Sequence, residues 1–347
     1  MKSIFDCERA ELAHSVSPPF RATQIFKSIY QRWLTSFEEM TDLPKSARAA
    51  LAGEWDAQLH AVHRRFDSID GTRRYLVRLA DGEFAETVYL PEEHRNTICI
   101  SSQIGCALAC TFCLTGQLGL TRHLNAGEIV TQVLLAQRDN LPWEERDHFN
   151  IVLMGMGEPL HNYDSVMKAV RILHDRNGLN MSMSRITLST AGLLPGIERL
   201  ATEPDIPNLA ISLTGATNMK RDELMPINRK YPIEALIAAV RRFPLKHRKR
   251  VTFEYVLFKG ITDSKEDARH LVRLLRGLPA EVNLIPFNEA EELDYKRPSD
   301  AAIRQFQSIL TEEHIDAFVR RNRGNDISAA CGQLKKKWVD SALSSVQ

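Results

Sequence analysis

The sequence predicts an α/β protein built on a mainly parallel sheet. Six short segments rich in apolar and β-branched residues recur along residues 96–313, with helical patterns between them. This alternation implies right-handed crossovers between parallel strands. An open doubly wound sheet and a partial (β/α) barrel both fit, and the pattern alone does not choose between them. The predicted strands are 97–102, 150–155, 185–190, 208–213, 251–257 and 281–286.

Several of the intervening helices have recognisable start signals. Asn125-Ala-Gly-Glu128 has the spacing of a capping box ahead of an apolar run. Asp164, Pro232 and Asp263 open further amphipathic segments. In either arrangement of the sheet, the chemistry is expected at the carboxyl ends of the strands.

The first part of the chain has a different pattern. Residues 1–60 predict a helical accessory domain, with apolar side chains at helical spacing over 20–33 and a second helix over 45–57. Residues 61–95 predict a β-hairpin connector. In that segment two alternating runs flank Asp81-Gly82, a dipeptide that favours a two-residue hairpin turn.

Composition excludes several classes of protein. The 347 residues are 44% hydrophobic and 26% charged, which are globular values and not those of a disordered chain. The formal net charge is only +1, so attraction to nucleic acid would have to come from local basic patches. The chain lacks a secretory signal pattern and any apolar run of about 18 residues. We therefore expect a soluble, cytoplasmic protein with no membrane partner, and take a monomer as the default.

The cysteines cluster in a way that indicates metal or redox chemistry. Cys106, Cys110 and Cys113 form a C-x3-C-x2-C motif just after the first predicted strand. Three thiolates on a tight loop can hold a 4Fe–4S cluster and leave one iron open to a non-protein ligand. A zinc site completed by His123, or three chance buried thiols, would be the alternatives. Structural zinc sites normally pair C-x2-C motifs from two separated halves, and the sequence lacks that arrangement.

With Phe112 before the third cysteine, the motif resembles the signature of radical S-adenosylmethionine (SAM) enzymes. Other segments, in the same order along the chain, resemble the RlmN and Cfr group of radical SAM RNA adenosine methyltransferases. These segments are 20–25, 41–45, 86–91, 99–106, 154–160 and 330–334. The resemblance covers almost the whole chain. It implies a partial (β/α)6 TIM-like barrel over 96–313 and a C-terminal strand with a mobile loop over 314–347.

The resemblance also implies a radical methylation of adenine. The C2 and C8 carbons are electron-poor, so neither attacks the methyl group of SAM as an ordinary nucleophile would. By resemblance, Cys331 carries a methyl group from a first SAM, and a 5′-deoxyadenosyl radical from a second SAM removes a hydrogen from it. Cys99 then attacks the Cys331 sulfur, releasing the RNA and leaving a transient disulfide. Glu86 is the implied base for the proton of the adduct.

Judged without the resemblance, these three residues differ in how strongly they indicate function. Cys331 lies in a polar, glycine-containing loop that suits an exposed carrier. Cys99 lies in an apolar strand and fits an ordinary core thiol equally well, and Glu86 alone fits a solvated strand residue. Matches to the family's SAM contacts are Gly157, Glu158, Ser189, Ser212, Leu213, Thr214 and Asn288. Thr214 departs from the family's usual His or Asn.

The implied substrate is C2 of an adenosine in 23S rRNA, at the peptidyl transferase centre. The adenosine adjacent to the anticodon in tRNAs is a candidate second substrate, and a flavodoxin or ferredoxin system is the implied electron donor. A Cfr-like C8 methyltransferase is the nearest alternative, and Pro159 favours C2. Two more distant alternatives are an RNA-binding protein whose cluster is only structural or redox-sensing, and an enzyme that catalyses a different radical SAM reaction. Basic segments that fit RNA are 241–242, 246–250, 320–323 and 335–337.

Overall fold

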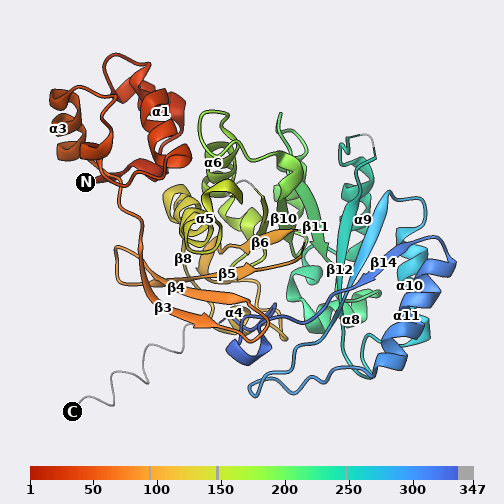
Figure 1. The fold of residues 1–347 in the computed structure, drawn as a ribbon. Helices are drawn as coiled ribbons and strands as arrows, with labels where there is room; N and C mark the ends of the chain where they lie inside the picture. Colours follow the sequence, from red (N-terminus) through yellow and green to blue (C-terminus); the bar gives the residue numbers. More distant parts are fainter. Residues whose placement is uncertain (94, 146–147, 247, 335–347) are drawn as a thin grey trace, which may run out of the picture.

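The computed structural model describes residues 1–93, 95–145, 148–246 and 248–334. Its main feature is a ten-stranded sheet in the order β14-β13-β12-β11-β10-β9-β6-β5-β4-β3 (Figure 1). Strands β6 through β14 of this sheet pair in parallel, each with its neighbour along the chain. The strand order never reverses, which is the connectivity of an incomplete (β/α) barrel and not of a doubly wound sheet.

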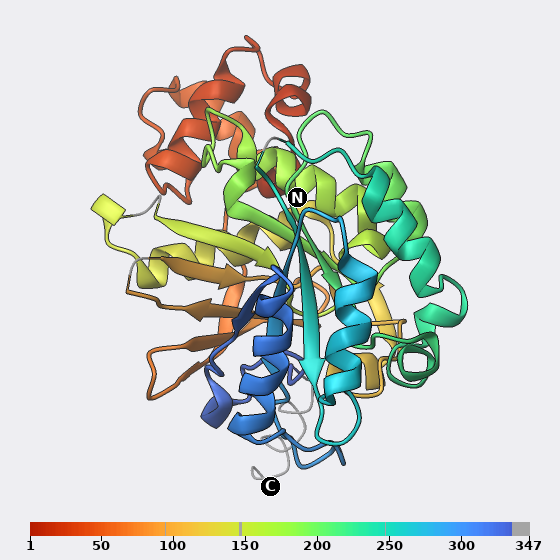
Figure 2. The same cartoon turned by 90° about the vertical axis from the view of Figure 1, so that its right-hand side faces the viewer.

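All six predicted strands are confirmed, and the C-terminal strand adds a seventh to the parallel part. Their bounds are β6 (Asn96–Cys99), β9 (Phe149–Leu153), β10 (Ile186–Thr190), β11 (Asn208–Ser212), β12 (Val251–Leu257), β13 (Ala280–Pro286) and β14 (Asp316–Val319). Interior positions such as Ile151, Leu188 and Phe253 are fully buried. Helices cover the outer face of this sheet (Figure 2). Strands in such a parallel sheet are buried on both faces, which explains their apolar sequences.

The start signals of the helices are largely confirmed. Asn125 Oδ1 accepts a hydrogen bond from Glu128 N at 2.8 Å, and Asn125 N donates to the Glu128 carboxylate at 2.9 Å. The last predicted start is one residue early, because Ser264 and not Asp263 caps α10. The bounds are α4 (Leu114–Gln117), α5 (Ala126–Asn140), α6 (Tyr163–His174), α7 (Leu194–Leu200), α8 (Asn218–Leu224), α9 (Ile233–Arg242), α10 (Lys265–Leu275) and α11 (Asp300–Glu312).

The predicted hairpin is present but belongs to the main sheet. Strands β4 (Arg73–Arg78) and β5 (Phe84–Leu90) pair antiparallel, β3 (Ala61–Asp67) adds a further strand, and β5 pairs with β6. The expected two-residue turn is wrong. Leu79 N donates to Glu83 O at 2.8 Å, which closes a three-residue loop. Gly82 ends that loop with φ +86°, a left-handed conformation that glycine adopts without strain.

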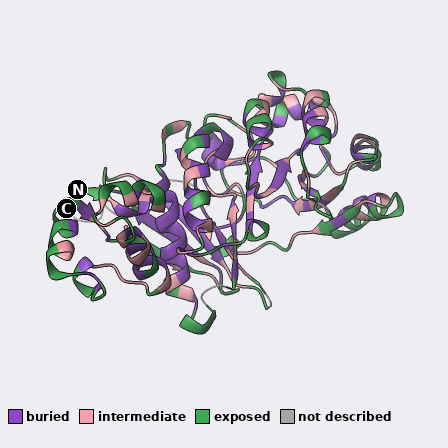
Figure 3. Cartoon of the chain, turned by 90° about the horizontal axis from the view of Figure 1, so that it is seen from above, coloured by how far each residue is buried: buried purple, intermediate pink, exposed green. Residues whose placement is uncertain are grey.

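The N-terminal segment is helical, with two differences from prediction. Helix α2 (Arg21–Phe26) continues as a π-helical turn over Lys27–Gln31, and α3 (Lys45–Glu54) ends before residue 57 because Trp55 pairs with Lys2. The other elements here are α1 (Arg9–Ser15), β1 (Lys2–Ser3) and β2 (Trp55–Asp56). The buried face of this segment is continuous with the core under the sheet (Figure 3). None of the described helices is long and apolar enough to cross a membrane.

Short elements complete the description. A two-stranded ribbon of β7 (Gln103–Gly105) and β8 (Leu120–His123) brackets the cysteine loop. Single turns of 3-10 helix occur at Ile4–Asp6, Phe37–Glu39, Trp143–Glu145, Pro159–Asn162, Met183–Arg185, Pro226–Arg229 and Asn325–Ile327.

The ribbon around the cysteine loop allows a controlled test of packing. Gly105 and Gly119 both have left-handed backbones, with φ +75° and +70°. A Cβ at position 105 would overlap the carbonyl oxygen of Gly119, whereas one at position 119 meets nothing within 4 Å. Gly119→Ala should lower the free energy of unfolding by about 1–2 kcal/mol through backbone strain alone. Gly105→Ala should lower it by about 1–3 kcal/mol more, because overlap adds to the strain.

Urea unfolding of the two variants beside the unsubstituted chain measures the difference. Equal destabilisation by both substitutions would contradict this packing of β7 against β8.

Candidate active site

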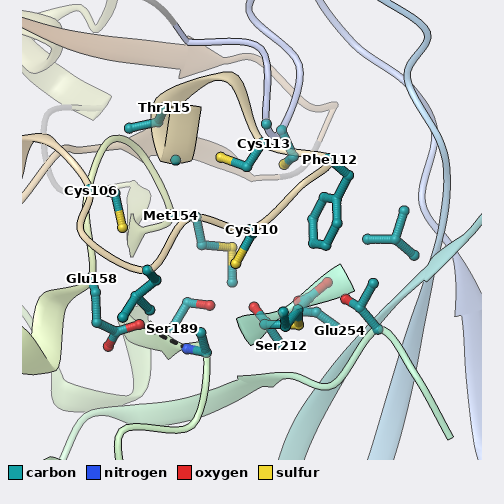
Figure 4. A pocket seen from close by; sticks show the side chains of 18 of the residues that line it. Cys106, Cys110, Phe112, Cys113, Thr115, Met154, Glu158, Ser189, Ser212 and Glu254 are labelled. Atoms are coloured by element: carbon teal, nitrogen blue, oxygen red, sulfur yellow. Dashed lines mark hydrogen bonds between the residues drawn. The ribbon is translucent and has the colours of Figure 1, made fainter. Parts of the chain in front are cut away.

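A cavity of about 180 Å³ opens at the carboxyl ends of the parallel strands. The three clustered cysteines line it together with most of the other predicted site residues (Figure 4). Those predicted residues are Cys106, Cys110, Cys113, Gly157, Glu158, Ser189, Ser212, Thr214, Asn288 and Cys331. Cys99, Glu86 and Leu213 are not among the described residues that line it. The sequence prediction therefore separates into one set around the cavity and a second set beside it.

The cysteine loop is held at both ends by backbone hydrogen bonds. Cys106 N donates to Gly119 O at 2.9 Å, and Cys113 N donates to Cys110 O at 3.1 Å. Burial raises the pKa of the Cys106 thiol to about 12 and also raises the pKa values of Cys110 and Cys113. The three thiols are therefore neutral without a metal. Bound iron would supply the positive charge that favours thiolates.

The donor set fits a cluster better than a single ion. Within the described ranges, no group of three His, Cys, Asp or Glu side chains is arranged to hold one metal ion. The thiolate ligands of an iron–sulfur cluster bind different irons and surround a larger body, so they need not converge on one point. His123, which the zinc alternative requires, contacts Gln103 through Nδ1 at 2.9 Å and is not among the described residues that line the cavity with the three cysteines.

The strand ends present polar groups to the cavity. Glu158 is buried, and its carboxylate accepts hydrogen bonds from Ala191 N at 2.8 Å and Leu160 N at 3.1 Å. Burial raises the pKa of this carboxyl group. Asn288 Oδ1 is buried without a hydrogen-bond partner among the described residues. A buried amide oxygen in a cavity wall is free to bind a donor on a ligand.

Two backbone features shape the same wall. Gly157 has φ +101°, and a Cβ there would stand 2.5 Å from Gln103 Cβ, so only glycine lets the chain pass here. Thr214 is buried and has φ +50°, which is strained for a β-branched residue. The position where the sequence departs from the family it resembles is thus held in an unusual conformation, and strain of this kind is concentrated at functional sites.

Two arginines at or beside the cavity have roles that the sequence did not predict. Arg221 is fully buried, and its guanidinium donates to Ser212 O at 2.8 Å, to Ala191 O at 2.5 Å and to Leu213 O. It thereby joins the ends of β10 and β11, although burial lowers its pKa to about 10. Its place in the polar helix α8 offered no signal. Arg320, expected in an RNA-binding patch, instead lines the cavity with Nη1 3.7 Å from Glu254 Oε1.

Two hydrogen bonds join the Cys331 loop directly to the cysteine loop. Leu114 N, one residue after Cys113, donates to Gly332 O at 2.8 Å, and Thr115 Oγ1 donates to Leu334 O at 2.8 Å. Cys331 itself is exposed at the cavity, as its polar loop predicts. The structure thus brings Cys331 and Cys113 to one place although 217 residues lie between them in the chain.

Cys99 and Glu86 lie beside this loop on the sheet. Cys99 is buried on β6, pairs in register with Val88 of β5 and belongs to an apolar cluster with Ala329 and Leu334. Burial raises the pKa of the Cys99 thiol to about 12. The interpretation of Glu86 as a solvated strand residue is wrong. Its side chain is only 2% exposed, and Oε2 lies 3.3 Å from Nη1 of the equally buried Arg74.

The first basic segment lies away from the site. Arg241 and Arg242 end α9, and the described residues 243–246 and 248–250 lie between α9 and the start of β12. The segment is therefore at the amino end of the strands, opposite the cavity. Lys249 donates to Asn208 at 3.2 Å, and Arg250 forms an ion pair with Asp316. The structure therefore does not place this segment at the cavity, and its fit to an RNA partner stays a prediction. Residues 335–337 of the other segment lie outside the described part of the chain.

Comparison with known proteins defines the class. Residues 100–274 match the model of the radical SAM superfamily. Residues 8–55 match that of the ribosomal RNA large subunit methyltransferase N-terminal domain. A radical SAM methyltransferase from Sphaerobacter thermophilus has the same fold, with a TM-score of 0.91 at 46% identity over 96% of this chain and 99% of that one. The fold and the three-cysteine cavity are those of a radical SAM protein, a class that binds a 4Fe–4S cluster and SAM.

Curated relatives narrow this to one family. The chain is 50% identical to the dual-specificity RNA methyltransferase RlmN of Pelobacter propionicus, over 93% of this chain and 91% of the relative. It is 52% identical to the protein of the same name from Geobacter sulfurreducens, over 92% of this chain and 86% of that relative. The chain belongs to the RlmN family.

The loop geometry predicts which cysteines hold iron. Replacement of Cys106, Cys110 or Cys113 by Ala should abolish assembly of a stable cluster, because each removes one of three thiolates from a single loop. Cys7→Ala should leave iron content unchanged, because Cys7 packs in the N-terminal core and does not line the cavity. Iron and sulfide per chain after anaerobic reconstitution measure this. A full cluster in any of the three loop variants would contradict the assignment.

Proposed function

We propose that this chain is a dual-specificity RNA methyltransferase that transfers a methyl group to C2 of adenosine. Its substrates are then an adenosine of 23S rRNA at the peptidyl transferase centre and the adenosine adjacent to the anticodon in tRNAs. The observation that carries the proposal is the exposed Cys331 at the rim of the three-cysteine cavity, with the buried Cys99 beside its loop. A carrier thiol needs access both to the cofactor and to the RNA.

The cavity residues are proposed to hold the two cofactors. Cys106, Cys110 and Cys113 would bind three irons of the cluster, and Gly157, Glu158, Ser189, Ser212, Leu213, Thr214 and Asn288 would contact SAM. Leu213 would do so from the cavity's edge. When bound, the cluster would supply one-electron chemistry, reducing SAM and accepting an electron from the adduct, and two SAM molecules per turnover would supply the methyl group and the radical that abstracts hydrogen from it.

Cys331 is proposed to carry the carbon being transferred. Its sulfur forms a bond to the methyl carbon as the bond from that carbon to the sulfonium of SAM breaks. After the methyl group has lost a hydrogen atom, its carbon bonds to adenine C2, and this step joins protein and RNA covalently. The hydrogen bond from Leu114 N to Gly332 O, at 2.8 Å, would keep Cys331 beside the cysteine loop while its sulfur takes the methyl group.

Glu86 and Cys99 are proposed to complete the reaction. Glu86 accepts the proton from C2, with Nη1 of the buried Arg74 at 3.3 Å from its Oε2. Cys99 then forms a bond to the Cys331 sulfur as the bond from that sulfur to the transferred carbon breaks. The released carbon takes up a proton to become the methyl group, and the two cysteines are left as a disulfide. A flavodoxin or ferredoxin system would reduce the cluster.

The domain division is proposed with this function. Residues 1–60 would bind folded RNA, 61–95 connect, 96–313 form the catalytic barrel, and 314–347 carry Cys331. An adenine stacked in a helix hides C2, so the substrate base must leave the stack before it reaches the cavity. The RlmN relatives described above favour C2 over the Cfr-like C8 alternative.

Nucleoside analysis tests the proposal. The purified holoenzyme, SAM and a chemical reductant should convert transcribed 23S rRNA and tRNA to products containing 2-methyladenosine, measured by liquid chromatography and mass spectrometry after digestion. Cys331→Ala should form no product, because it removes the carrier, whereas Cys7→Ala should match the unsubstituted enzyme. Formation of 8-methyladenosine, or turnover by Cys331→Ala, would overturn the proposal.

A further inference from the structure

One face of the antiparallel extension carries a group of residues that the sequence did not connect. Register places Arg74 of β4 opposite Val88 of β5, and Val88 opposite Cys99 of β6. Directly paired residues share a face, and so do residues two apart on a strand. Arg74, Glu86 and Cys99 therefore lie on the same face, with Glu86 diagonal to both of the others.

The Cys331 loop covers this face. Ala329 and Leu334 of the loop pack with Val88 and Cys99. Upstream in the loop, Asp326 accepts hydrogen bonds from Ser68 Oγ at 2.6 Å and Ile69 N at 3.2 Å, both in the turn between β3 and β4. Figure 1 shows this last described segment, in dark blue, beside β4. The β3–β4 hairpin is thus an anchor for the loop that carries Cys331.

Arg74 joins these two features. Its Nη1 lies 3.3 Å from Glu86 Oε2 and 3.4 Å from the carbonyl oxygen of Ser328, three residues before Cys331. The guanidinium also lies over the ring of Phe66, 4.3 Å from its centroid, which fixes its plane. With 1% of its surface exposed, Arg74 has no access to solvent that would let the side chain swing away.

We propose that Arg74 is a positioning residue that holds the Glu86 carboxylate in register with the loop carrying Cys331. The inference rests on the proposed function, in which Glu86 accepts the proton from the RNA adduct. The adduct hangs from Cys331, so the base is useful only if its position relative to that loop is fixed. One guanidinium nitrogen that touches both the base and the loop backbone meets this requirement. The planar guanidinium is held over the ring of Phe66, which the flexible stem and ammonium group of a lysine would not reproduce.

Single-turnover kinetics on the holoenzyme test the role of Arg74. An RNA hairpin labelled with ³²P is mixed with reduced enzyme and SAM, and the covalent protein–RNA adduct is followed by denaturing electrophoresis after acid quench. Arg74→Lys keeps a positive charge beside Glu86 but loses the planar guanidinium that lies over Phe66. We expect its adduct to decay on the order of ten- to a hundredfold more slowly, with Cys331 methylation and iron content unchanged. Cys99→Ala lacks the thiol that would release the RNA, so its persistent adduct identifies the position of the protein–RNA band on the gel.

Three further variants separate the possible outcomes. Arg73→Gln is the matched control, because Arg73 points to the other face of the sheet and its Nη1 donates to Asn140 Oδ1 at 3.0 Å. The adduct formed by this variant should decay at the rate of the unsubstituted enzyme. Glu86→Gln should prolong the adduct, and adding Arg74→Lys to it should have little further effect if Arg74 acts through Glu86. An unchanged adduct lifetime in Arg74→Lys would overturn the inference, as would a parallel loss of Cys331 methylation and iron. An unchanged lifetime in Glu86→Gln would instead overturn the proposed base.

Discussion

The hydrogen bond from Leu114 N to Gly332 O is the contact on which the site depends. At 2.8 Å it fastens the loop that follows the barrel's first strand to the loop at the far end of the described chain. The bond from Thr115 Oγ1 to Leu334 O repeats the connection one residue later. These two contacts hold the loop of the exposed Cys331 directly against the loop of the three cysteines. The barrel forms the cavity, and the two hydrogen-bonded loops place Cys331 at it.

The antiparallel strands give the carrier loop a second support. In a barrel alone, β6 would be an edge strand. Here β5, β4 and β3 extend the sheet past it and provide a face for the Cys331 loop. Cys99 and Glu86 are both buried on that face, so the proposed chemistry on the adduct is kept away from water. The same sheet thus supports two sites, one at the strand ends and one on its face.

Much of this could be predicted from sequence, because the signals are local. Strand–helix alternation, the Asn125 capping box and the C-x3-C-x2-C spacing each follow from a few neighbouring residues. Contacts between distant segments left no such signal. The burial of Glu86 depends on Arg74 across a strand pair, and the role of Arg221 depends on carbonyl groups at two strand ends. Arg320 sits in a basic run, yet the end of β14 directs it into the cavity.

The central claim is that Cys331 carries the methyl group. Peptide mass spectrometry of the enzyme, purified without oxygen and with its cluster intact, tests it most directly. The account predicts one added methyl group on the Cys331 peptide and none on the peptides of Cys7 or Cys99, since Cys331 alone among these three lines the cavity and is exposed. An unmodified Cys331 beside a complete cluster, after incubation with SAM, would contradict it.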